Sequence, residues 1–76
     1  MDKQKFIENF KDALEIEGRE LALTDKFRDY PEWSSLAFLS VIAMIDDEYD
    51  VVIEGKDFKT LNTLQDIADA IERAKN

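Results

Sequence analysis

The chain has 76 residues, of which 45% are hydrophobic and 37% are charged, a balance typical of one small globular domain over residues 1–76. Because it has no cysteine and no histidine, disulfides, zinc sites with the usual ligands, Cys–His dyads and Ser–His–Asp triads are excluded. Ten Lys and Arg residues against eighteen Asp and Glu residues give a net charge of −8, which disfavours nucleic acid and anionic membranes and favours basic partners.

Residues 1–17 have the pattern of an amphipathic helix. Its apolar positions recur at helical spacing, and they are Phe6, Ile7, Phe10, Ala13 and Leu14. Asp2 is suited to cap the helix start, because a short polar side chain can accept hydrogen bonds from free backbone N–H groups. Gly18 predicts that the helix ends near Glu17, because glycine readily adopts the left-handed conformation of many helix ends.

The same N-terminal segment and the longest apolar stretch bear on localisation. The first ten residues have mixed charge and no long apolar run, unlike a secretory signal or an Arg-rich transit peptide. Residues 36–45 are apolar except for Ser40, but these ten residues are too few for a membrane-spanning helix, which needs about 20. We therefore expect a cytoplasmic protein without a membrane span, and we interpret this stretch as part of a buried helix.

Residues 19–33 show no sustained period and predict a long loop. Three apolar residues, Leu21, Leu23 and Phe27, are expected to hold this loop against the core.

A second helix is predicted to begin at Ser34 or Ser35. Pro31 disfavours helix in the residue before it, and Ser34 can cap the helix that follows. Trp33 and Phe38 occupy the two positions of a hydrophobic staple, which fixes how the chain enters a helix.

Both sides of this second helix are apolar. One side has Phe38, Val41, Ile42, Ile45 and Tyr49, and the other has Leu36, Ala37, Ser40, Met44 and Asp47. Since the second set is too apolar for an ordinary solvent-facing side, either the helix is mostly buried or this side is a docking surface, and both can hold for different residues. A packed core is predicted from Phe10, Ile42, Ile45, Ile67 and Ile71.

A run of carboxylates, Asp46, Asp47, Glu48 and Asp50, ends the second helix, where the helix dipole does not favour negative charge. Alternate acidic positions resemble an EF-hand loop, but Val51 stands where the loop needs glycine and Asp57 where it needs glutamate. The pattern therefore favours a solvated acidic patch, and we predict no metal site.

The C-terminal third is predicted to contain one short and one long helix. Residues 51–53 are β-branched but have no strand partner, so we expect an extended loop with apolar side chains in the core. Gly55 predicts a turn, and residues 57–61 predict a helical turn with Phe58 and Leu61 inward. A final helix, capped by Asn62 or Thr63, has an apolar stripe of Leu64, Ile67, Ala68, Ile71 and Ala74. The fold class is thus all-α, a bundle of three main helices plus one short helix.

The segment Trp33-Ser34-Ser35-Leu36 resembles the signature of the acyl and peptidyl carrier protein family, an Asp-Ser-Leu at the start of the second helix. The apolar residues 37–45, the acidic residues 46–50 and the segment Thr63-Leu-Gln-Asp-Ile67 also resemble that family. The chain is particularly similar to stand-alone carriers with Trp-Asp-Ser-Leu at this point. The resemblance implies a covalent 4′-phosphopantetheine arm on Ser35, and the departure from the family is Ser34, where the family has Asp.

The arm would supply the thiol that the chain lacks, so the resemblance implies a carrier of acyl or aminoacyl thioesters and not an enzyme. Expected partners are a phosphopantetheinyl transferase, an adenylate-forming ligase or acyltransferase, and an acceptor enzyme, and the carrier is expected to be a monomer. Partner contacts are predicted at Ser34, Leu36, Ala37, Ser40, Met44 and Asp47. The alternative is a carrier-like interaction module that is not modified. A hydrolase using Ser35 is disfavoured, because no histidine is present to act as its base.

Overall fold

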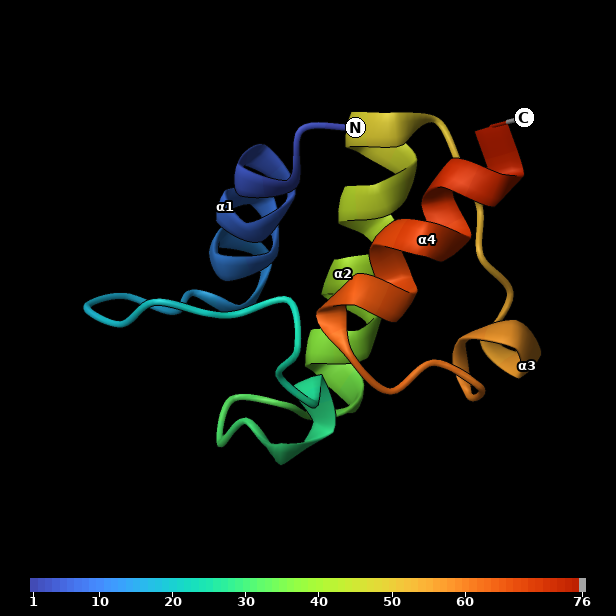
Figure 1. Cartoon of the computed structure of the whole chain (residues 1–76). Helices are drawn as coiled ribbons and strands as arrows, with labels where there is room; N and C mark the ends of the chain where they lie inside the picture. The colour runs from blue at the N-terminus through green and yellow to red at the C-terminus, as the bar shows by residue number, and fades with distance from the viewer. Residues whose placement is uncertain (76) are drawn as a thin grey trace.

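The computed structural model describes residues 1–75, whose elements are four α-helices and one 3₁₀ turn (Figure 1). In chain order they are α1 (Lys3–Leu14), η1 (Phe27–Asp29), α2 (Ser35–Tyr49), α3 (Gly55–Phe58) and α4 (Leu64–Lys75). Helix α1 packs against both α2 and α4, and the loop that leaves α1 leads through η1 to the start of α2. The predicted all-α bundle of three main helices and one short helix is confirmed.

Helix α1 begins as predicted but ends earlier. The Asp2 side chain accepts a hydrogen bond from the backbone N–H of Lys5 at 3.1 Å, which confirms the cap. The helix stops at Leu14, because Glu15 takes the left-handed conformation (φ 58°) and the N–H of Ile16 donates to the carbonyl of Lys11. This closure turns Ile16 into the core, where it is buried. The prediction of an end near Glu17 and Gly18 was therefore wrong, because tertiary burial decides where the helix stops.

The long loop is held in place by buried apolar side chains and by backbone hydrogen bonds. Leu21 and Phe27 are buried and Leu23 is half-buried, as predicted. In addition, the loop carbonyls of Leu23 and Asp25 accept hydrogen bonds from the first N–H groups of α4, at 2.9 and 3.2 Å. These N–H groups have no partner within their own helix, so the loop both covers the core and completes the start of α4.

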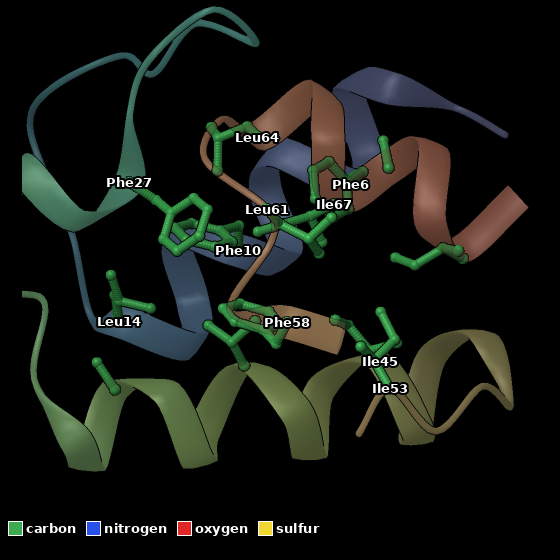
Figure 2. Close-up of a cluster of buried hydrophobic side chains, with 14 of the residues drawn as sticks. Phe6, Phe10, Leu14, Phe27, Ile45, Ile53, Phe58, Leu61, Leu64 and Ile67 are labelled. Carbon is green, nitrogen blue, oxygen red and sulfur yellow. The ribbon is translucent and has the colours of Figure 1, made fainter. Parts of the chain in front are cut away.

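Side chains from every element meet in one core (Figure 2). Phe6 and Phe10 come from α1, Phe27 from η1, Phe58 from α3 and Ile67 from α4. The phenylalanine rings pack edge to face or tilted, with the centroids of Phe10 and Phe27 6.4 Å apart and those of Phe27 and Phe58 5.4 Å apart. Such aromatic pairs add to the stabilisation from burial alone.

Helix α2 is rotated relative to the predicted core side. Its buried residues are Ala37, Val41 and Ile45, at intervals of four, whereas Ile42 is only half-buried. The prediction that Ile42 belongs to the central core was wrong, and Val41 occupies that place. Because α2 is apolar on two sides, its own sequence does not select the buried side, and contact with α1 decides it.

From the end of α2 through α4, the chain follows the predicted pattern with differences at α3 and at Ala74. Val51 and Ile53 are buried while Val52 is 71% exposed, as expected for an extended segment that lies on the core. The short helix spans Gly55–Phe58 and not residues 57–61 as predicted, so Gly55 opens a helix where a turn was expected. Phe58 and Leu61 point into the core as predicted, but Ala74 of the predicted α4 stripe is exposed.

The start of α4 is closed by reciprocal capping. The Thr63 hydroxyl accepts a hydrogen bond from the N–H of Asp66 at 3.1 Å, and the Asp66 carboxylate accepts from the N–H groups of Asn62 and Thr63 at 2.9 and 3.1 Å. Of the two predicted caps, the structure thus uses Thr63. The N–H of Asn62, and next that of Thr63, lowers the pKa of Asp66 below its ordinary value of 3.8.

We expect the Asp66→Asn variant to lose part of the acid sensitivity of folding. Because the pKa of Asp66 is lower when folded, its carboxylate stabilises the protein above about pH 4, and this contribution is lost as the pH falls through the lower, folded value. Urea unfolding across this acid range should show a steeper fall in unfolding free energy for the parent than for the variant. Equal slopes for the two proteins would contradict the prediction.

Candidate functional site

Two adjacent serines at the start of α2 have different structural roles. Ser34 is the N-cap, in an extended conformation, and its Oγ accepts a hydrogen bond from the N–H of Ala37 at 3.0 Å. Ser35 is the first helical residue and is exposed, and within residues 1–75 its hydroxyl has no hydrogen-bond partner. The Ser35 hydroxyl is therefore available for modification without loss of the cap.

The backbone at this point favours a negative charge. The N–H groups of the first helical turn have no carbonyl four residues earlier within the helix, and the helix dipole has its positive end here. The Ser34 side chain satisfies the N–H of Ala37. The first backbone bond of the helix runs from the N–H of Phe38 to the carbonyl of Ser34, so the N–H groups of Ser35 and Leu36 have no partner within the helix. A phosphodiester on Ser35 would thus lie beside free donors.

A groove of about 450 Å³ opens next to Ser35, and its lining is mostly apolar. It is lined by Arg28, Trp33, Ser34, Ser35, Phe38, Gly55, Phe58 and Lys59. The aromatic rings hold one another in place: Trp33 lies parallel to Phe58 with centroids 6.1 Å apart, and Phe38 meets Phe58 edge to face at 5.1 Å. The two residues predicted as a staple, Trp33 and Phe38, therefore share Phe58 as a packing partner.

Arg28 fixes the side of this groove formed by η1. Its guanidinium donates hydrogen bonds to the carbonyl of Leu61 and, at 3.2 Å, to that of Phe58, and it lies 4.7 Å from the centroid of Phe27. These contacts join η1 to the segment between α3 and α4. Arg28 and Lys59 were not predicted from the sequence, because the groove brings together segments that are about thirty residues apart, as the bonds of Arg28 to Phe58 and Leu61 show.

The segment that leads to Ser34 is held by polar contacts. Arg19 forms a two-pronged ion pair with Glu32, with N–O distances of 2.7 and 2.8 Å, and these hydrogen bonds lower the pKa of Glu32 to about 2. The Tyr30 hydroxyl donates to Asp25 at 2.8 Å, and burial together with this bond raises the pKa of Tyr30. The N–H of Ala22, and next the Tyr30 hydroxyl, lowers the pKa of Asp25. These contacts position the loop just before the serines.

The predicted partner residues do not form one exposed surface. Leu36, Ser34 and Asp47 are exposed, but Ser40 and Met44 are half-buried and Ala37 is buried at 7% exposure. Ala37, predicted as a partner contact on a side that could also be buried, belongs to the core, because α1 packs over this side of α2.

Exposed apolar area on α2 instead comes from Leu36 and Leu39, which are 73% and 60% exposed. They lie three positions apart and therefore on one side of the helix. Leu39 was not predicted on either side of α2, although a large apolar residue that fits neither predicted stripe was a usable signal.

The acidic patch at the end of α2 is solvated, and Asp46, Asp47, Glu48 and Asp50 are all exposed. Among residues 1–75, no group of three or more Asp and Glu side chains is arranged to hold a metal ion. Within the same residues, no helix combines the length and the apolar character needed to cross a bilayer.

Comparison with known protein families gives a match over most of the chain. The family model described as a phosphopantetheine attachment site matches residues 4–71, which include all of α2 and the groove residues. Neither the curated proteins nor the solved structures give a match to this chain.

Proposed function

The chain belongs to the family of phosphopantetheine attachment domains, and from this premise we propose that it carries an acyl or aminoacyl group as a thioester on Ser35. Proteins of this family carry 4′-phosphopantetheine covalently on a serine, and they are carriers and not catalysts. The attached group supplies the thiol that forms the thioester, which a chain without cysteine cannot supply itself.

The observation that supports Ser35 is the division of roles between the two serines. Ser34 uses its side-chain oxygen to cap α2, whereas Ser35 presents an unpaired, exposed hydroxyl at the first helical position. A phosphodiester on Ser35 is stabilised by the free N–H groups of the first turn. The groove beside it offers Trp33 and Phe58 as apolar surface for a group that is attached there. The residues present therefore fit the prosthetic group.

The test of this function is the mass of the protein from its native cells. We expect the intact mass to be increased by one phosphopantetheine, and fragmentation should place this modification on the peptide that contains Ser35. The purified unmodified protein should also accept the same group from coenzyme A in the presence of a broad-specificity transferase. If neither sample is modified, the carrier function is overturned in favour of the unmodified interaction module, in which α2 binds a partner directly.

The proposed partners are a phosphopantetheinyl transferase, a ligase or acyltransferase that loads the arm, and an acceptor enzyme that unloads it. Any of these must reach Ser35 at the start of α2, so we propose a docking surface formed by Leu36 and Leu39. Exposed apolar residues supply contact area, while Asp46 and Asp47 at the other end of the helix attract a basic partner over a longer range.

Leu39→Glu is expected to slow modification by the transferase, because it removes apolar contact area and places a charge in the interface. A contact of ordinary strength predicts a reduction of kcat/KM by about tenfold, equivalent to about 1.4 kcal/mol. Val52→Glu is the matched control, since Val52 is similarly exposed but lies beyond the end of α2. Circular dichroism should show both variants folded, and equal kcat/KM for them would remove Leu39 from the docking surface.

A further inference from the structure

The groove beside Ser35 has a charge opposite to that of the whole protein. The chain has a net charge of −8, yet no residue that lines this groove is acidic, and two of them, Arg28 and Lys59, are cations. Within residues 1–75, neither cation forms an ion pair, whereas Arg19 and Lys56 are paired with Glu32 and Glu54. The groove is thus a local positive region on an acidic surface.

The positive charge lies beside apolar surface. Trp33, Phe38 and Phe58 form the aromatic part of the groove, and their packing against one another fixes their positions. Arg28 is also fixed, because its guanidinium is bonded to the carbonyls of Phe58 and Leu61 and stacked on Phe27. Lys59 is exposed, and its ammonium has no hydrogen-bond partner within the described chain. A bound group therefore meets an apolar wall and two cations together.

We propose that the cargo carried on Ser35 is an acyl group with an apolar body and a free carboxylate, and that the body lies on Trp33 and Phe58 while the carboxylate faces Arg28 and Lys59. This inference rests on the proposed carrier function and selects one class of cargo within it. The net charge of the chain repels a carboxylate, but in this groove it meets two cations, and no Asp or Glu lines the groove. A neutral chain gains only the apolar contact, and the ammonium of an aminoacyl group is repelled.

The test compares three cargoes of matched length, an adipoyl, a hexanoyl and a 6-aminohexanoyl group, each loaded from its coenzyme A thioester by a broad-specificity transferase. Trp33 is the only tryptophan and lines the groove, so acrylamide quenching of its fluorescence reports how fully each cargo is seated. We expect the equilibrium constant between cargo bound in the groove and cargo in solvent to be about two- to fivefold larger for adipoyl than for hexanoyl, which is the range of an exposed ion pair. This constant should be smallest for 6-aminohexanoyl. High salt should reduce the difference. The phosphodiester is common to all three cargoes and cancels in the comparison.

Lys59→Gln should reduce the preference for adipoyl, because it removes one cation and breaks no described hydrogen bond. Lys56→Gln is the matched control, since Lys56 is three positions away, pairs with Glu54 and does not line the groove, and it should keep the full preference. Equal seating of the three cargoes on a fully loaded protein would overturn the cargo proposal and leave the carrier function standing. Failure to load any cargo would overturn the carrier function instead.

Discussion

Replacing Ser35 with alanine is expected to abolish the attachment of 4′-phosphopantetheine. The hydroxyl of Ser35 is the exposed, unpaired oxygen at the start of α2, and its loss removes the acceptor atom. The variant should keep the fold, because Ser35 makes no hydrogen bond through its side chain within residues 1–75 and alanine is the best helix former. Incubation with coenzyme A and a broad-specificity transferase, followed by intact mass measurement, should show no mass increase.

Ser34→Ala is the matched control, because the two serines are adjacent and equally small. This variant should still be modified, but it loses the oxygen that caps the N–H of Ala37, at a cost of about 0.5–2 kcal/mol in unfolding free energy. The two variants should therefore differ in opposite ways, one in modification and the other in stability. Modification of Ser35→Ala together with an unmodified Ser34→Ala would transfer the site to Ser34.

The largest loss of stability is expected for Phe10→Ala. Phe10 is fully buried, and its ring lies within 6.5 Å of the rings of Phe6, Phe27, Tyr30 and Trp33, measured between centroids. Removing a buried phenylalanine ring costs about 3–5 kcal/mol, which is a large part of the stability of a small domain. Urea unfolding monitored by circular dichroism measures the loss.

Ile42→Ala is the comparison variant for this experiment, because Ile42 is only half-buried. Its loss should be clearly smaller than that of Phe10→Ala. If Phe10→Ala does not fold, Phe10→Leu keeps most of the buried volume and should still be less stable than the parent. An unfolding free energy of Phe10→Leu equal to that of the parent, or a greater loss from Ile42→Ala than from Phe10→Ala, would show that the core is not centred on these rings.

The substitution of Ser34 for the Asp of the family signature has a local and a remote consequence. Locally, both residue types cap helices, and the observed bond from the Ala37 N–H shows that Ser34 does so here. Remotely, a transferase that reads a carboxylate next to the acceptor serine finds a hydroxyl instead. For a transferase that modifies this chain, we propose other contacts in place of that carboxylate, at the exposed Leu36 and Leu39.

The amino-acid sequence by itself determined the features that depend on near neighbours. Caps at Asp2, Ser34 and Thr63 each use an N–H three residues away, so the local pattern identified them or limited them to two adjacent residues. The start of the second helix, and with it the position of Ser35, was predicted for the same reason. The family also followed from the sequence, because residues 33–36, residues 37–50 and the segment 63–67 all resemble it, and the family model matches residues 4–71.

Only the tertiary structure decided the features that depend on distant residues. Helix α1 ends at Leu14 because Ile16 enters the core, and α2 buries Val41 rather than Ile42 because of its contact with α1. The groove beside Ser35 also depends on distant residues, since the hydrogen bonds of Arg28 to the carbonyls of Phe58 and Leu61 join segments about thirty residues apart. Helical periodicity describes which residues share a side, but where several sides are apolar, the energy of packing against other elements selects the buried one.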